Sequence, residues 1–105
     1  MKVTRDNFIG GWFCGDFEPT AFHTKEFEVC YKIHEKGEIW PPHYHKIATE
    51  INYLMKGKMV VQGKTLIAGD VFIIDPGEVA DPVFLKKCEL IVIKVPSVKG
   101  DKYNV

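Results

Sequence analysis

Three residues in the middle of the chain have the types and the spacing of a small metal site. His43 and His45 lie two positions apart, and residues so spaced on an extended strand point to the same face. Glu50 follows, so the next strand can bring its carboxylate to the two imidazoles. Two imidazoles and one carboxylate suit a first-row divalent metal, and with open positions they form the facial arrangement of non-haem iron sites. The sequence therefore predicts that His43, His45 and Glu50 bind a divalent transition metal, whether Fe, Mn, Ni, Co or Zn.

Two glycines enclose this group and mark tight turns before and after the paired strands. The segment from Gly37 to Gly57 resembles the first motif of the cupin superfamily, which has the form G-x5-H-x-H-x3–4-E-x6-G. All five anchor residues of that motif are present. The resemblance implies the jelly-roll barrel of small single-domain cupins, with the metal ligands facing its interior.

A later segment resembles the second cupin motif, G-x5-P-x-G-x2-H, only in part. Gly69 and Gly77 match, whereas Pro76 stands one position after the proline of the motif. Ala80 occupies the place of the final histidine and is followed by Asp81. The departure leaves the predicted fold intact but removes the usual fourth metal ligand.

Asp81 has two interpretations. On a regular strand it would face away from the position of the missing histidine, but a bulge or the turn before Pro82 could redirect it inward. It would then be a fourth ligand or an acid and base above an open metal site, and we predict it as a catalytic residue on that basis. Alternatively, it is a loop carboxylate that accepts a hydrogen bond from a nearby backbone N–H.

Composition describes a small globular protein. The 105 residues suit one domain, and 46% of them are hydrophobic. Fourteen basic residues balance fourteen acidic ones, and the lack of a basic block argues against a nucleic-acid surface. No apolar leader or membrane span is visible, and the three cysteines lack a CxxC spacing. We therefore expect a cytoplasmic protein with reduced thiols.

Short strands separated by turns account for most of the chain, and no useful helical periodicity appears. This pattern predicts an all-β fold, which we interpret as a single antiparallel jelly-roll β-barrel. Residues 1–105 form one domain, with an N-terminal arm over about 1–25 and a polar tail over about 96–105. The expected strands are 27–33, 51–55, 59–62, 65–67, 71–74, 83–85 and 90–95.

Aromatic residues near the predicted metal site are candidates for the wall of a substrate pocket, although each could equally be part of the core. They are Tyr31, Trp40, Tyr53 and Phe84. His34 lies where a strand ends, and we expect it to be solvated. Lys32 is also expected in solvent, since strand lysines usually are, but inside the barrel it could hold an anionic group.

A second aromatic cluster, near the N-terminus, either forms a homodimer interface or closes one end of the barrel. It comprises Phe8, Trp12, Phe13, Phe17 and Phe22. Small single-domain cupins usually dimerise, so the resemblance favours the homodimer.

Two functions of different classes remain open. The first is a metalloenzyme acting on a small polar metabolite such as a sugar derivative, as an isomerase, an epimerase or an oxygenase. The second is a non-catalytic module that binds a metabolite or a metal. The sequence shows no general-base pair, nucleophile triad or phosphate loop that separates them.

Overall fold

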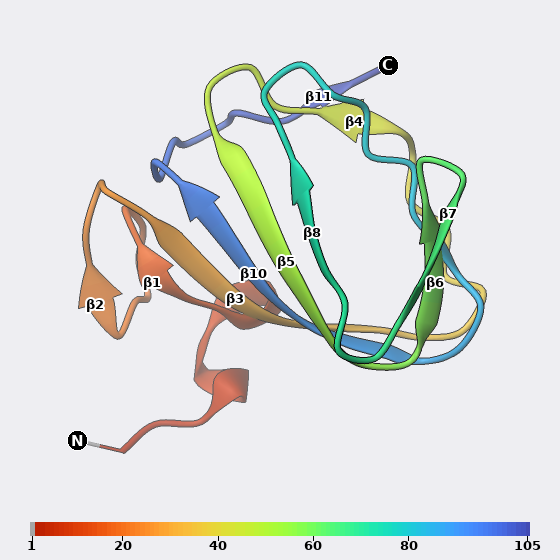
Figure 1. Cartoon of the computed structure of the whole chain (residues 1–105). Helices are drawn as coiled ribbons and strands as arrows, with labels where there is room; N and C mark the ends of the chain where they lie inside the picture. Colours follow the sequence, from red (N-terminus) through yellow and green to blue (C-terminus); the bar gives the residue numbers. More distant parts are fainter. Residues whose placement is uncertain (1) are drawn as a thin grey trace.

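The structure, a computed structural model that describes residues 2–105, is built almost entirely of strands (Figure 1). Two short 3₁₀ turns, η1 (Arg5–Asn7) and η2 (Ile9–Gly11), precede the first strand. The all-β prediction is confirmed. The strands are β1 (Trp12–Gly15), β2 (Phe22–His23), β3 (Glu28–His34), β4 (His43–Tyr44), β5 (Thr49–Lys56), β6 (Lys58–Val61), β7 (Lys64–Ile67), β8 (Val71–Ile74), β9 (Val83–Phe84), β10 (Cys88–Val95) and β11 (Tyr103–Asn104).

The strands form two facing sheets and a short pair that joins them. The larger sheet has the order β2-β1-β3-β10-β5-β8, the smaller has β7-β6-β9, and β11 pairs with β4. All pairs are antiparallel except β1 with β2. In Figure 1 the larger sheet curls toward β6 and β7, and β4 and β11 lie across one end between the sheets. This is the predicted jelly-roll arrangement.

The turns between the strands depend on glycine where the sequence suggested it. Gly57 has φ 105°, and a Cβ there would lie 2.3 Å from the Lys87 carbonyl oxygen, so β5 can turn into β6 only with glycine at this point. Gly77 has φ 85°, and the Glu78 N–H donates to the Asp75 carbonyl at 3.0 Å. Residues 75–78 therefore form a tight turn with Pro76 and Gly77 at its centre.

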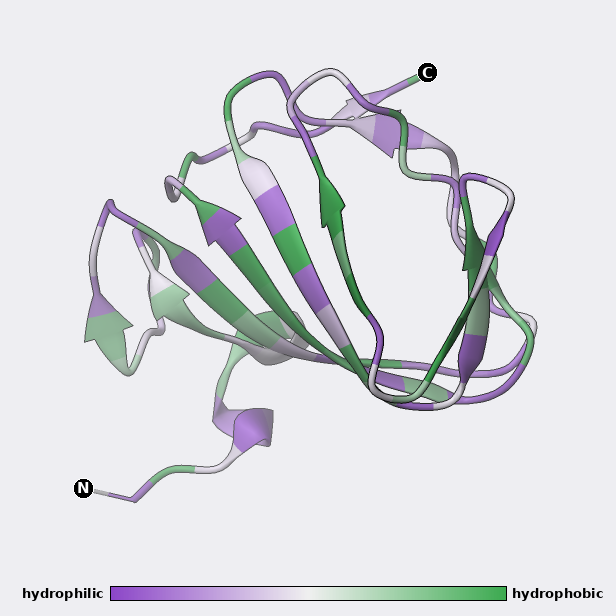
Figure 2. Ribbon diagram, viewed as in Figure 1, coloured by the Kyte–Doolittle hydropathy of each residue, from purple (hydrophilic) through white to green (hydrophobic). Residues whose placement is uncertain are grey.

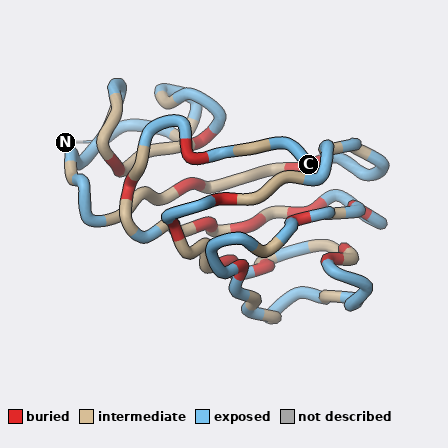
Figure 3. Tube along the Cα trace, turned by 90° about the horizontal axis from the view of Figure 1, so that it is seen from above, coloured by how far each residue is buried: buried red, intermediate tan, exposed pale blue. Residues whose placement is uncertain are grey.

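Side chains alternate between the inside and the outside of the barrel. On β5, Asn52 and Leu54 are buried, whereas Tyr53 between them is exposed. Figure 2 shows hydrophilic and hydrophobic residues alternating along part of this strand. Buried stretches lie along strands of both sheets, while most connecting loops are exposed (Figure 3). The hydrophobic core consists of Cys30, Leu54, Met59, Val61, Ile74, Ala80, Phe84, Cys88, Leu90 and Val92.

The polar tail is held firmly against the barrel. Asp101 is only 7% exposed, and its carboxylate accepts hydrogen bonds from the backbone N–H groups of Lys46, Ile47 and Ala48 at 2.9, 3.1 and 2.9 Å. Beyond it, β11 pairs with β4. The tail therefore closes one end of the barrel beside His43.

Two further observations concern the chain as a whole. No helix within residues 2–105 has the length and hydropathy needed to cross a bilayer. Cys14, Cys30 and Cys88 are free thiols.

Candidate functional site

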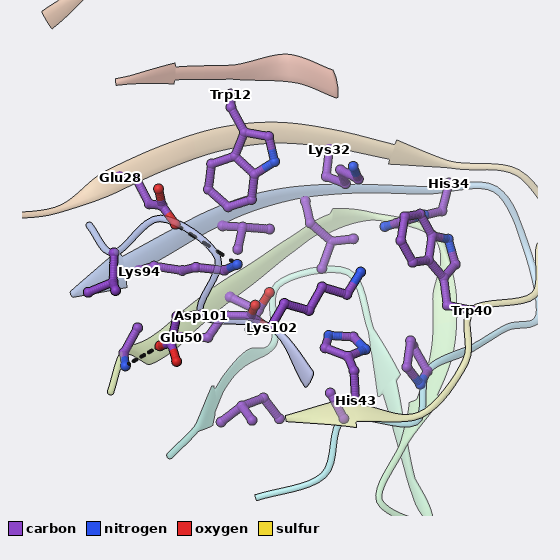
Figure 4. A pocket seen from close by; sticks show the side chains of 18 of the residues that line it. Trp12, Glu28, Lys32, His34, Trp40, His43, Glu50, Lys94, Asp101 and Lys102 are labelled. Atoms are coloured by element: carbon purple, nitrogen blue, oxygen red, sulfur yellow. Dashed lines mark hydrogen bonds and ion pairs between the residues drawn. The ribbon is translucent and has the colours of Figure 1, made fainter. Parts of the chain in front are cut away.

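A cavity of about 530 Å³ lies inside the barrel, between the larger sheet and the strands β4, β6 and β9 (Figure 4). This volume suits a small-molecule ligand. Apolar side chains from both sheets cover much of its wall, among them Trp12, Trp40 and Phe72. Charged side chains come from β3, β5, β10 and the tail, so the cavity combines a largely apolar wall with charged groups of both signs.

A row of three charged residues crosses the wall of the larger sheet. Lys94 on β10 is the register partner of Glu28 on β3 and of Glu50 on β5. The Lys94 ammonium lies 3.9 Å from the Glu28 carboxylate and 4.9 Å from the centroid of the Trp12 ring. Burial raises the pKa of Glu28, and the Lys94 ammonium opposes that shift. Glu28 and Lys94 therefore partner each other within the cavity.

The two predicted histidine ligands are neighbours. The ring centroids of His43 and His45 are 5.6 Å apart, with the rings nearly perpendicular. His43 Nδ1 lies 3.2 Å from the carbonyl oxygen of Pro41. Because a carbonyl only accepts, Nδ1 carries the proton and Nε2 keeps a free lone pair. Burial lowers the pKa of both imidazoles, which favours the neutral form that a metal binds.

His45 is the most unusual polar residue of the molecule. It is 1% exposed, and neither of its ring nitrogens has a hydrogen-bond partner among residues 2–105. A buried polar group without a partner costs about 1–3 kcal/mol. A group bound to His45 would remove that cost, and a metal shared with His43 is one such group.

Glu50 lies on the same inner face but is not brought into a closed coordination sphere. Its Oε2 accepts a hydrogen bond from Asn52 Nδ2 at 3.0 Å, and its charge raises the pKa of both His43 and His45. Among residues 2–105, no three His, Cys, Asp or Glu side chains converge as a metal-binding group. The residues thus fit a metal through two adjacent imidazoles with open nitrogens, and Glu50 is the nearby carboxylate.

Ala80 and Asp81 separate in the structure. Ala80 is buried, lines the cavity and forms an antiparallel bridge with His43. Asp81 is exposed and does not line this cavity, and its Oδ1 accepts a hydrogen bond from the Gln62 N–H at 2.8 Å. This placement corresponds to the loop-carboxylate interpretation of Asp81 and not to the inward, catalytic one.

Two of the four predicted pocket residues lie at the cavity. Trp40 and Phe84 line it, whereas Tyr31 and Tyr53 do not. Tyr53 is 48% exposed, and the Tyr31 hydroxyl donates to Glu89 on the outer face. Both tyrosines occupy the outward parity of their strands, which corrects the expectation that they form a pocket wall.

His34 is buried in the cavity wall, contrary to the expectation that it is solvated. Its ring stacks on Phe84 with centroids 4.1 Å apart, and its Nδ1 lies 2.9 Å from Glu38 Oε1. The same oxygen accepts from Trp40 Nε1 at 2.6 Å. Burial alone would raise the pKa of Glu38, but hydrogen bonds from His34, Trp40 and the Glu35 backbone lower it to about 2. Glu38 therefore orients His34 as a carboxylate orients the histidine of a proton-transfer pair.

Lys32 and Lys102 are the other polar residues that sequence reasoning placed wrongly or missed. Their ammonium groups lie 5.3 and 4.6 Å from the centroid of the Trp40 ring. Figure 4 shows the Lys102 side chain reaching across the cavity near His43. Although much of Lys102 is exposed, burial lowers its pKa, and the charges of Lys94 and Lys32 add to that shift.

Comparison with known proteins supports the fold. No family model and no curated protein matches the chain. Among solved structures, a Klebsiella pneumoniae protein with a double-stranded beta-helix domain has a TM-score of 0.68 at 18% identity, with 81% of this chain and 79% of that chain covered. A cupin-2 domain protein from Shewanella frigidimarina has a TM-score of 0.57 at 20% identity, with 69% and 72% covered. The DMSP lyase DddQ from Ruegeria pomeroyi has a TM-score of 0.74 at 16% identity, with 90% of this chain but 49% of the lyase covered.

The chain therefore has the cupin fold, a double-stranded β-helix. At these identities the likeness shows the fold alone, and the function has to be argued from the cavity.

Proposed function

We propose that the protein binds a divalent transition metal at His43, His45 and Glu50 and acts on a small polar metabolite, such as a sugar derivative, in the cavity beside it. The observation that carries this proposal is the buried His45 imidazole, whose nitrogens lack partners within the described part of the chain while His43 presents an open nitrogen nearby. A metal supplies Lewis acidity toward a carbonyl or hydroxyl oxygen of a ligand.

The remaining residues of the site hold groups in place. The Pro41 carbonyl fixes the tautomer of His43, and Asn52 orients the carboxylate of Glu50. His34 lies across the cavity with its Nδ1 turned to Glu38, so its Nε2 is the nitrogen available to take or give a proton. Isomerisation or epimerisation of a sugar derivative needs such a proton transfer, and the same barrel could instead support oxygen-dependent oxidation.

Metal content tests the proposal directly. Protein purified without a histidine tag and without chelator is offered Fe, Mn, Ni, Co and Zn in turn, and bound metal is measured by elemental analysis. We expect one of these metals to bind near one equivalent and His45→Ala to lose most of it while the barrel stays folded. His23→Ala is the matched control, because His23 is exposed and paired with Asp16. Less than about a tenth of an equivalent in every case would reject the metal site.

A non-catalytic binding module is the second candidate, and the structure of the second motif favours it. Ala80 contributes no ligand, and Asp81, the expected acid and base, is turned to a loop N–H. A screen of sugar phosphates, nucleotide sugars and keto acids on metal-loaded protein, with and without oxygen, separates the two candidates. Consumption of any of them supports the enzyme, and saturable binding without turnover supports the module.

Two further proposals concern the setting of the protein. Three free thiols support a cytoplasmic location, where thiols stay reduced. The edges of the larger sheet, β2 and β8, support a homodimer, since exposed sheet edges are usually covered.

A further inference from the structure

Lys32 and Lys102 bring two positive charges to one aromatic ring without a matching carboxylate. Both ammonium groups lie over Trp40, at 5.3 and 4.6 Å from its centroid. Within the described residues, neither is within 4.0 Å of an acidic side chain. Lys32 is half-buried on β3 and faces the cavity with His34.

Three acidic residues that line the cavity, and Glu38 beside it, have partners of their own. Glu28 is paired with Lys94, and Asp101 accepts three backbone hydrogen bonds. Glu38 is held by His34 and Trp40, and Glu50 by Asn52. Lys32 and Lys102 therefore have no carboxylate in ion-pair contact within the described residues, and the charge of Glu50 only partly opposes the lowering of the Lys102 pKa.

The two lysines repel each other in the absence of a ligand. Burial lowers the pKa of Lys102, and the neighbouring ammonium groups of Lys94 and Lys32 lower it further. Like charges held close in a partly desolvated cavity favour the arrival of an anion that both can contact. Cation–π contact with Trp40 keeps the two ammonium groups near one place.

We propose that Lys32 and Lys102 form an anion-binding subsite beside Trp40, which holds a carboxylate or phosphate group of a small-molecule ligand. The inference deepens the proposed function by naming the substrate class, a metabolite that carries an anionic group. Each lysine would donate a charge-assisted hydrogen bond to the anion. Lys102 is pre-positioned for this role because the adjacent Asp101 fixes the tail to residues 46–48.

Three sugars that differ in one group test the subsite: glucose 6-phosphate, glucuronate and neutral glucose. Binding is measured by calorimetry and by the fluorescence of Trp40. The fluorescence is recorded in Trp12→Phe protein, in which Trp40 is the one tryptophan left of the two in the sequence. We expect at least one charged sugar to bind at least tenfold more tightly than glucose and to change the Trp40 emission. Preference for glucose 6-phosphate identifies phosphate as the anion, and preference for glucuronate identifies carboxylate.

Charge-removing variants show whether the lysines are responsible. Lys102→Met and Lys32→Met keep the aliphatic stem. Each should lower the affinity for the charged sugar at least tenfold, toward the affinity for glucose. Lys64→Met removes a charge from exposed β7 and should leave binding unchanged. If one cavity variant does not fold, judged by circular dichroism, the other still decides.

Two outcomes overturn the subsite. The first is equal affinity for charged and neutral sugars, which includes no detectable binding of any sugar at about 10 mM, on the order of a weak metabolite site. The second is a loss of affinity in Lys64→Met equal to the loss in the cavity variants. The proposal of a metal site is tested independently of the anion-binding subsite. His45→Ala should lose metal yet retain the preference for the charged sugar. If wild-type protein binds no metal but still binds the charged sugar through the two lysines, only the metal site is refuted. If the protein binds metal but has equal affinity for charged and neutral sugars, only the subsite is refuted.

Discussion

Ala80 lies directly opposite His43 in an antiparallel bridge. The His43 N–H donates to the Ala80 carbonyl at 3.1 Å, and the Ala80 N–H donates to the His43 carbonyl at 2.7 Å. Side chains of directly paired residues project from the same face of a sheet, and both residues line the cavity. The methyl group of Ala80 therefore stands where the second cupin motif has its histidine.

This pairing predicts that a fourth ligand can be restored. Ala80→His should place an imidazole beside those of His43 and His45 and raise the affinity for Zn²⁺ or Ni²⁺ at least tenfold, because each added ligand adds a coordinate bond. Competition with a chromophoric chelator measures the change. Val79→His, at an exposed neighbouring position, should not alter affinity. An Ala80→His protein that folds but binds no better would mean that the bridge does not aim its side chain at the metal.

The Glu38 carboxylate controls the protonation of His34. Burial lowers the pKa of His34, and the hydrogen bond that its ring donates to the Glu38 carboxylate partly opposes that shift. Glu38→Gln should therefore lower the pKa of His34 further, which NMR titration of the ring protons detects. The same variant should lose about 1 kcal/mol of stability, because the three hydrogen bonds that the Glu38 carboxylate accepts are weakened when a neutral amide replaces it. Glu35→Gln is the control, and equal His34 titration in both variants would contradict this relation.

Asp101 should make stability depend on acid pH. Burial would raise the pKa of Asp101, but hydrogen bonds from the backbone of Ala48, Lys46 and Ile47 outweigh it and lower the pKa. A carboxyl group whose folded pKa lies below its unfolded value stabilises the protein above about pH 4 and loses that contribution as the pH falls through the folded pKa. Asp101→Asn should cost about 1–3 kcal/mol at pH 7.

Chemical denaturation at several pH values checks this expectation. The difference between wild type and Asp101→Asn should shrink as the pH falls below about 4. A difference that stays constant from pH 7 to pH 3 would show that geometry rather than charge holds the tail. Asp75→Asn, at an exposed turn, serves as the control.

The homodimer remains a prediction that light scattering decides. Val71 and Ile73 are 62% and 53% exposed on the edge strand β8, and Phe22 is 59% exposed on the opposite edge, β2. We expect a mass of twice 12.0 kDa at micromolar concentration. Val71→Lys and Phe22→Lys then tell which edge is covered, since burying a lysine in an interface is unfavourable. A monomeric wild type would refute the dimer.

The sequence predicts which residues share a face better than it predicts which face is inside. Strand β3 alternates as expected, but the side that enters the cavity carries Glu28, Lys32 and His34. Apolar Val29 and Ile33 take the other parity. Along this strand, which supplies charged groups to the cavity, the usual assignment of apolar residues to the interior fails.

The same reasoning explains the success and failure at the site. His43 and His45 were identifiable as neighbours because two positions of local spacing bring their ring centroids to 5.6 Å, whereas Glu50 comes from β5, which does not pair with β4. Lys94 and Lys102 were not, because their positions depend on long-range register and on the anchoring of the tail by Asp101. Tyr53 was misplaced since an aromatic residue suits either face of a strand.

The pairing of β11 with β4 has a practical consequence for handling the protein. Tyr103 and Asn104 are register partners of Tyr44 and His43, so an affinity tag fused after Val105 would emerge beside the candidate metal ligands. The imidazoles of a polyhistidine tag at that position would bind metal themselves, and this binding would be mistaken for binding at the candidate site. The N-terminal end of the described chain lies on the far side of the molecule (Figure 1), and a removable tag belongs there.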